Sequence, residues 1–71
     1  MNDKRLKILG LNIKAERTRK ELTQEQLAEK AATSRNSISL IEKGSQSLSA
    51  LKLIDISKAL EIDLNELIKN I

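Results

Sequence analysis

The sequence predicts an all-α fold, a compact unit of five helices. Apolar residues recur three and four positions apart in successive segments, which is the spacing of one face of a helix. Proline is absent and glycine occurs only at positions 10 and 44, so few residues interrupt those segments. Because no linker, low-complexity tract or repeat divides the chain, we expect one domain over residues 1–71.

The first helix is expected from about Asp3 to Lys20, and it is both amphipathic and basic. Its inward side is formed by Leu6, Leu9, Gly10 and Ile13. Residues 1–20 hold seven basic and two acidic side chains, whereas residues 46–71 hold three basic and four acidic ones. Such a basic run forms either a solvated helix face or a positive field for a polyanion.

Two short helices joined by a tight turn are expected between Thr23 and Gly44. Thr23 is a natural N-cap, and Gln26 completes a capping box. The second helix of the pair begins after Ser34 and ends at Gly44. The inward residues of the pair are Leu27, Ala28, Ala31, Ile38 and Ile41. A helix pair of this kind can present its second helix to the major groove of DNA.

Two further helices are expected after a polar connection. Ser49 is a suitable N-cap for a fourth helix that continues through Leu60. The inward positions of this helix are Leu53, Ile56 and Leu60, with Leu51 and Ile54 beside them. A fifth, short helix is expected from Leu64 to about Asn70.

The composition excludes several classes of function. The chain has no Cys and no His, which removes thiol and imidazole nucleophiles, the usual zinc ligands and the commonest general base. We therefore expect no enzyme, no catalytic residues, no metal and no cofactor. Aromatic residues are absent as well, so the base stacking used by single-strand binders is excluded. A chain of 71 residues lies near the lower limit for a solitary core, which dimerisation would help to stabilise.

Membrane and export signals are also missing from the sequence. The N-terminus has no uninterrupted apolar stretch, and no segment approaches the roughly 20 apolar residues that span a bilayer. We therefore expect a cytoplasmic protein without a membrane partner. The basic first helix could alternatively lie on an anionic membrane surface, but it lacks the Trp or Phe that usually anchor such helices.

Three ordered segments resemble the Cro/repressor-type (XRE-like) helix-turn-helix family. They are LGLNIKAERTRKELTQEQLA at 9–28, SRNSISLIEKG at 34–44 and LIDISKALEIDLNEL at 53–67. The match covers nearly the whole chain and places the helix-turn-helix at about 23–43. It implies a five-helix, lambda repressor-like fold that binds double-stranded DNA, usually as a dimer on an operator with two-fold symmetry.

The resemblance implies that base edges are read from the third helix, by Arg35, Asn36, Ser39 and Leu40. Arg can bond O6 and N7 of guanine, and Asn can bond N6 and N7 of adenine. Alternatively, Arg35 binds only phosphate, and Ser39 contacts only the DNA backbone. Leu40 departs from the polar reader usual in the family, so it either contacts a thymine methyl group or packs at the helix edge.

Contacts with the DNA backbone are implied on both sides of the third helix. Gln24 matches a family position that commonly bonds phosphate, where free amides and the positive end of a helix already favour an anion. The alternative is that Gln24 is a tolerated surface residue. The complete set of expected backbone contacts is Gln24, Thr23, Ser37, Lys43, Ser45 and Gln46.

The resemblance also implies two structural features. Arg17 and Glu42 are expected to form a salt bridge between the first and third helices, unless Glu42 is a surface acid near Lys43. Glu21 and Ala32 occupy turn positions where the family often has glycine, so either residue could adopt a positive φ angle at a cost of roughly 1 kcal/mol or more.

The C-terminal segment holds more apolar surface than the end of a small chain needs. These residues are Ile62, Leu64, Leu67, Ile68 and Ile71. Either they form a dimer face, since members of the family commonly dimerise near this region, or they simply close the monomer core. A two-fold dimer would place two recognition helices about 34 Å apart, one turn of DNA.

The leading hypothesis is a small bacterial or phage transcriptional regulator that binds a specific duplex as a homodimer. A phage repressor, a restriction-modification controller and an antitoxin all share this compact design. The alternative is an antitoxin or adaptor that uses the helical scaffold chiefly to hold a protein partner. Such an adaptor has no need of Arg35 and Asn36, and its DNA binding should depend little on salt.

Overall fold

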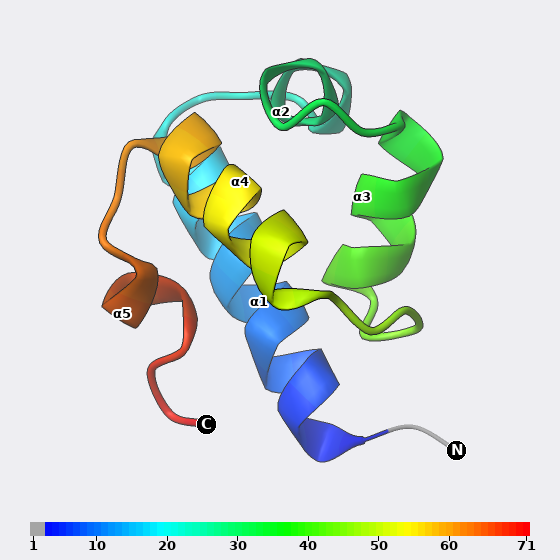
Figure 1. Ribbon diagram of the computed structural model, residues 1–71, viewed down its shortest axis with the longest axis vertical. Helices are drawn as coiled ribbons and strands as arrows, with labels where there is room; N and C mark the ends of the chain where they lie inside the picture. The colour runs from blue at the N-terminus through cyan, green and yellow to red at the C-terminus, as the bar shows by residue number, and fades with distance from the viewer. Residues whose placement is uncertain (1–2) are drawn as a thin grey trace.

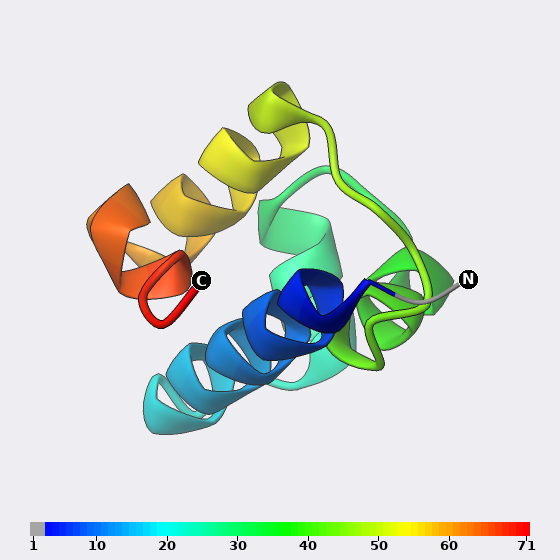
Figure 2. The same cartoon turned by 90° about the horizontal axis from the view of Figure 1, so that it is seen from below.

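The computed structural model describes residues 3–71, which form five helices and confirm the expected all-α fold (Figure 1). The helices are α1 (Lys4–Arg19), α2 (Gln24–Lys30), α3 (Arg35–Glu42), α4 (Ala50–Leu60) and α5 (Leu64–Leu67). Turning the view separates α1 from α4, which overlap in Figure 1, and α3 lies at one edge of the molecule in both views (Figure 2). No helix in the described part of the chain is both long and apolar enough to cross a bilayer.

Each of these helices begins with a side chain that accepts a hydrogen bond from a backbone amide of the first turn. The caps are Asp3, Thr23, Ser34, Ser49 and Asp63. At α2 the capping box is complete, because the Gln26 amide donates to Thr23 Oγ1 at 3.0 Å and the Thr23 amide donates to Gln26 Oε1 at 2.8 Å. At α1, hydrogen bonds from the Arg5 side chain and backbone lower the pKa of Asp3 to about 2. These caps satisfy amides that would otherwise lack partners at the helix starts.

The core of residues 3–71 is one apolar cluster to which every helix contributes. Its buried members are Leu9, Ile13, Leu27, Ala28, Ala31, Ile38, Ile41, Ile56, Leu60 and Leu67. Nine of these ten were expected to face inward from their helical spacing, which confirms the faces assigned to α1, α2, α3 and α4. Leu6 and Leu53 are half-buried, and Leu51 remains exposed beside the core positions of α4.

The expected length of the fifth helix is wrong, because α5 ends at Leu67 and not near Asn70. The side-chain amide of Asn12, on α1, donates to the backbone carbonyls of Leu67 and Lys69, both at 2.9 Å. Asn70 then adopts a left-handed backbone with φ 68°. The Asn12 side chain therefore satisfies backbone carbonyls of the last segment, and the left-handed Asn70 is incompatible with a continuing helix.

Candidate nucleic-acid interface

Helix α3 turns one side to the core and the other to solvent. Its buried residues are Ile38, Ile41 and Glu42. The residues expected to read bases lie on the remaining surface, where Arg35 and Asn36 are exposed and Ser39 and Leu40 are half-buried. Arg35 and Asn36 occupy the first turn of α3, directly after the Ser34 cap. Their polar ends can therefore reach a groove without disturbing the core.

A hydrogen-bonded network around Glu42 joins α1, α2 and α3. Arg17 donates from Nε to Glu42 Oε2 at 2.7 Å and from Nη2 to Oε1 at 3.1 Å. Gln24 Nε2 donates to the same Oε1 at 3.0 Å, and Arg17 Nη1 donates to the Leu22 carbonyl at 2.7 Å. The side chains of Arg17 and Glu42 are only 13% and 3% exposed. The expected ion pair is thus present and buried, and it fixes the position of α3 on the rest of the fold.

The network also shows how Gln24 is held at the first turn of α2. Its bond to Glu42 uses one of the two amide hydrogens of the side chain. The second hydrogen stays available for an anion at the amino end of α2. Gln24 is therefore neither a loose surface residue nor fully committed to the protein interior, since it is half-buried.

The other residues expected at the DNA backbone divide between two places. Thr23 is exposed, and because its hydroxyl oxygen accepts the Gln26 amide, the hydroxyl hydrogen remains free to donate. Lys43 and Ser45 are exposed directly after α3, with Gln46 half-buried beside them. Because Gln24 bonds Glu42 at the carboxyl end of α3, Gln24 and the adjacent Thr23 lie near this end as well. Ser37 is half-buried nearer the start of α3, where its oxygen accepts from the Ser34 hydroxyl at 3.1 Å.

Residues with a left-handed backbone shape the turns on both sides of α2, at the two positions where the family often has glycine. Glu21 has φ 58° and Ala32 has φ 55°. In the turn before α3, the Thr33 amide donates to the Ala28 carbonyl at 2.9 Å and closes the end of α2. Glu61 adopts the same conformation after α4 with φ 56°, which the sequence reading did not anticipate.

The two glycines allow α1 and the end of α3 to touch through their backbones. A Cβ added at Gly10 would meet the Ile41 carbonyl oxygen and lie 2.7 Å from that of Glu42. Gly44 has φ 75°, and a Cβ there would lie 2.8 Å from the Cα of Lys7. Glycine is therefore required at both positions by close approach, and at Gly44 also by the backbone angle.

Two polar residues of α1 were missed in the sequence. Glu16 is buried and accepts from Arg19 Nη2 at 2.6 Å. It lies three residues after Ile13 and seven after Leu9, so the apolar spacing of α1 could have placed it on the inward face. Asn12 bonds the C-terminal segment, and no local pattern signals that contact.

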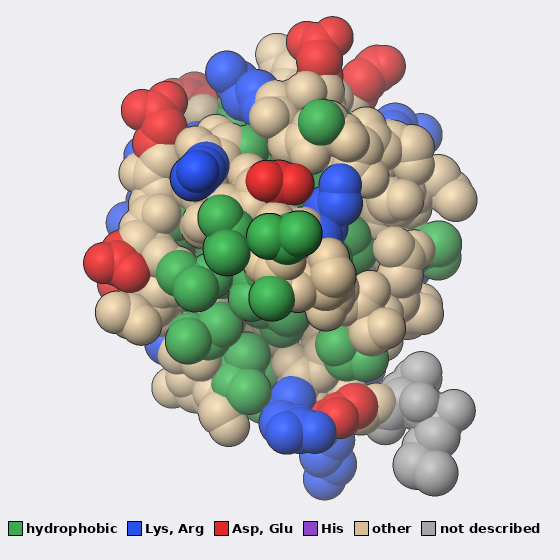
Figure 3. Space-filling model, in the orientation of Figure 1, with side chains coloured by type: hydrophobic (Ala, Val, Ile, Leu, Met, Phe, Trp, Pro, Cys, Tyr) green, Lys and Arg blue, Asp and Glu red, His purple; other side chains and the backbone are tan. Residues whose placement is uncertain are grey.

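Exposed apolar side chains gather on the face that α4 and α5 present in Figure 1, where hydrophobic atoms form a broad patch (Figure 3). The exposed large residues near these helices are Leu51, Ile54, Ile68 and Ile71. Of the five residues considered for a dimer face, Leu67 is fully buried in the core. Ile62 is partly buried against the core and Leu64 is half-buried. The alternative that these residues close the core therefore holds for Leu67.

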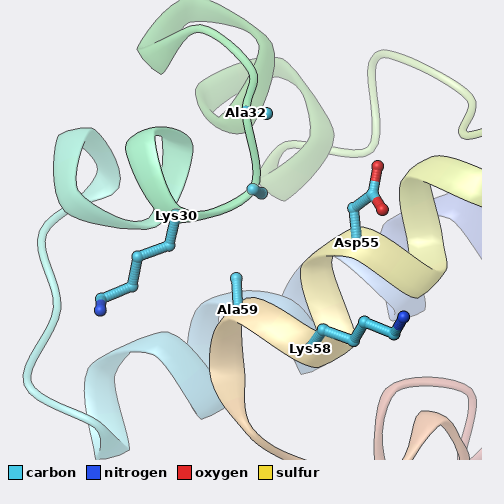
Figure 4. Close-up of a pocket in the computed structure, with 6 residues that line it drawn as sticks. Lys30, Ala32, Asp55, Lys58 and Ala59 are labelled. Atoms are coloured by element: carbon cyan, nitrogen blue, oxygen red, sulfur yellow. The ribbon is translucent and has the colours of Figure 1, made fainter.

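An open pocket of about 290 Å³ lies between the end of α2 and α4, lined by Lys30, Ala31, Ala32, Asp55, Lys58 and Ala59. Its charged groups do not converge, because Lys30, Asp55 and Lys58 point in different directions (Figure 4). Residues 3–71 also contain no cluster of acidic side chains suited to a metal ion. The polar groups that do converge are those around α3.

A short capped helix, a tight turn and a second helix with an exposed polar face define a helix-turn-helix DNA-binding domain. The chain belongs to the Cro/repressor-type helix-turn-helix family, since the helix-turn-helix family model matches residues 13–67. This is a family of DNA-binding regulators and not of enzymes. No curated protein sequence is significantly similar to the chain.

Solved structures give the same fold. The restriction-modification controller protein C.AhdI from Aeromonas hydrophila is similar with a TM-score of 0.86 and 31% identity, over 87% of this chain and 94% of that one. The wild-type controller protein C.Esp1396I is 40% identical with a TM-score of 0.79, over 82% and 75% of the two chains. The P22 c2 repressor, solved with a synthetic operator, is 27% identical with a TM-score of 0.80, over 89% and 96%.

Proposed function

We propose that this protein is a sequence-specific, double-stranded DNA-binding transcriptional regulator of the restriction-modification controller or small phage repressor type. The observation that carries the proposal is the exposed first turn of α3, with Arg35 and Asn36, on a helix held by the buried Arg17–Glu42 pair. The controller proteins and the operator-bound repressor that share this fold support the same function.

In this proposal Arg35 and Asn36 read base edges. Two parallel donors of Arg35 bond guanine, and the amide of Asn36 bonds adenine, each pair contributing about 1 to 3 kcal/mol of discrimination. Ser39 lies one helical turn after Arg35 and Asn36, on the same side of α3, and adds a hydroxyl group. Leu40 is half-buried, so it has both an apolar surface for a thymine methyl group and contacts within the protein.

Phosphate contacts then come from groups at the two ends of the helix pair. Gln24 and Thr23 offer an amide and a hydroxyl hydrogen beside the positive end of α2. Lys43, Ser45 and Gln46 follow α3, and Ser37 lies on its flank. These contacts fix the orientation of α3 on the duplex, while the base contacts specify the sequence.

A homodimer on a two-fold symmetric operator completes the proposal. The patch over α4 and α5 supplies the interface, with Leu51 74%, Ile54 37%, Ile68 40% and Ile71 49% exposed. Ile62 and Leu64 are half-buried, and Leu67 contributes only from within the core. Such a dimer places two copies of α3 about one DNA turn apart.

The proposal is tested by fluorescence anisotropy on a labelled duplex from upstream of the protein's own gene, with a scrambled duplex of the same composition as the control. We expect tight binding that weakens steeply with salt and strongly prefers the native duplex. Binding that is weak and indifferent to sequence across all duplexes tried would contradict it.

The apolar patch also supports a second candidate, an antitoxin or adaptor that holds a protein partner. Four exposed aliphatic residues on or next to α4 and α5 are more than a monomeric domain needs. This candidate requires that DNA binding depend little on salt, and that removal of the patch abolish a protein complex while any duplex binding is unchanged.

A further inference from the structure

The basic residues of α1 fall into two sets in the structure. Its three arginines are paired, Arg5 with Asp3 at 2.7 Å, Arg17 with Glu42 at 2.7 Å and Arg19 with Glu16 at 2.6 Å. Its lysines are exposed, and among residues 3–71 they have no salt-bridge partner. They are Lys4, Lys7 and Lys14, followed by Lys20 after the helix. The lysines, and not the arginines, therefore carry the positive field that this helix offers to an external anion.

Two of these lysines border the contact between α1 and α3. Lys7 and Lys14 each lie three residues before a residue of that contact, Gly10 and Arg17 respectively, so they share the same side of the helix. The backbone of Gly44 also lies directly against Lys7, whose Cα and N would be 2.8 and 3.0 Å from an added Cβ. Because both side chains are exposed, they lie on the solvent side of the α1–α3 contact.

The same end of α3 holds further groups suited to phosphate. Lys43 is exposed there and has no salt-bridge partner within residues 3–71. Gln24 is held at this end by its bond to Glu42. Glu42 itself is buried and neutralised by Arg17, so it does not offset the lysines. Donors from α1, α2 and the end of α3 thus meet around one border of the recognition helix.

We infer that Lys7 and Lys14 bind phosphates of the DNA strand that borders the major groove entered by α3. This inference rests on the proposed function, because α3 must lie in a groove for the flanking strand to reach α1. Lysine suits the task as a flexible point charge that adapts to a phosphate position. Such contacts add affinity and orient the domain, and they carry no sequence information.

The test compares two double variants with the same loss of charge. Lys7→Gln with Lys14→Gln removes the two proposed contacts. Lys20→Gln with Lys30→Gln is the matched control, because those lysines are also exposed and line a second pocket beside Leu60, at the end of α4 and away from the α1–α3 contact. Anisotropy is measured over a salt series on the labelled native duplex and on the scrambled duplex.

We expect the slope of log K against log salt to fall in magnitude by about 1.8 for the Lys7 and Lys14 variant, from about 0.9 per phosphate contact. Affinity should fall by the same factor on both duplexes, so the preference for the native duplex is kept. The control should retain the wild-type slope. Equal slopes for the two variants would overturn the inference.

A structural role for the lysines gives a different result. Lys7 lies near the negative end of α3 and could stabilise the fold there. In that case the Lys7 and Lys14 variant melts at a lower temperature than the control by circular dichroism while its salt slope is unchanged, and the inference fails. Wild-type protein without preference between duplexes counts against the proposed function alone, because the slopes on either duplex still test the lysines.

Discussion

At the scale of single residues, the proposed DNA interface combines two exposed candidate base readers with a buried ion pair that supports the helix. Arg35 and Asn36 reach solvent from the first turn of α3, where nothing in the core constrains their ends. Glu42 lies at the other end of the same helix, buried, with donors from Arg17 and Gln24. We expect changes in Arg35 to affect DNA binding and changes in Glu42 to affect stability, and two substitutions separate these roles.

Replacement of Arg35 by alanine should weaken binding to the native duplex by about 1 to 3 kcal/mol, or roughly 5- to 150-fold. Binding to a scrambled duplex should change much less, because a base contact is made only on the correct sequence. Anisotropy on the two duplexes measures both effects, with Lys30→Ala at the end of α2 as a variant of equal charge change outside the proposed contacts. Equal losses on both duplexes would show that Arg35 contacts phosphate only.

Replacement of Glu42 by alanine should lower the free energy of unfolding by about 3 to 5 kcal/mol, because it leaves the Arg17 charge buried and unpaired. The control is Glu66→Ala, which removes an exposed pair with Lys69 at 3.6 Å and should cost less than about 1 kcal/mol. Urea denaturation followed by circular dichroism compares them. Similar midpoints for the two variants would mean that the buried pair contributes little.

At the scale of elements, the fold relies on short helices with strong ends and on close backbone contacts. The capping box gives the short helix α2 a defined start. Gly10 and Gly44 bring α1 within backbone contact of α3, so the recognition helix is placed by its own peptide groups as well as by side chains. The left-handed residues Glu21 and Ala32 make the turns around α2 tight at some cost in stability.

That cost predicts the effect of glycine in the turn before α3. Ala32→Gly should raise the free energy of unfolding by up to about 1 kcal/mol, because glycine adopts φ 55° without strain. Ala15→Gly, at an exposed position within α1, should instead lower it by roughly 0.5 to 1 kcal/mol. Urea denaturation measures both. If Ala32→Gly lowered the free energy of unfolding, as Ala15→Gly is expected to do, Ala32 would not be strained.

At the scale of the whole molecule, two surfaces lie on different elements. The proposed base readers, and the lysines that have no salt-bridge partner within residues 3–71, surround α3 and its contact with α1, whereas the exposed aliphatic residues lie over α4 and α5 (Figure 3). This separation allows one surface to bind DNA while the other joins two copies of the chain. In the proposed dimer, each copy contributes one recognition helix to a symmetric site.

The proposed dimer predicts the behaviour of variants in the apolar patch. Leu51→Gln with Ile54→Gln should shift the protein from dimer to monomer in sedimentation equilibrium and weaken native-duplex binding at least tenfold, since one half-site alone must then provide the affinity. Leu11→Gln is the control for the sedimentation measurement, an exposed leucine on α1. A monomeric wild type, or dimers that persist in the double variant, would exclude this interface.

The sequence alone determined the features that depend on neighbouring residues. Helical spacing predicted the inward faces of α1 to α4, and the Thr23 and Ser49 caps predicted two helix starts, because both depend on contacts within one or two turns. The exposed Arg35 and Asn36 follow from the same spacing. These features form in any fold that keeps the segments helical.

Only the tertiary structure decided which distant residues meet. Asn12, on α1, donates to the Leu67 and Lys69 carbonyls at the end of α5, and Leu67 belongs to the core. Lys7 and Lys14 look like any exposed lysines until α3 packs beside them. The physical reason is that packing sets how helices cross, and a polar or charged side chain takes its role from the groups that packing brings to it.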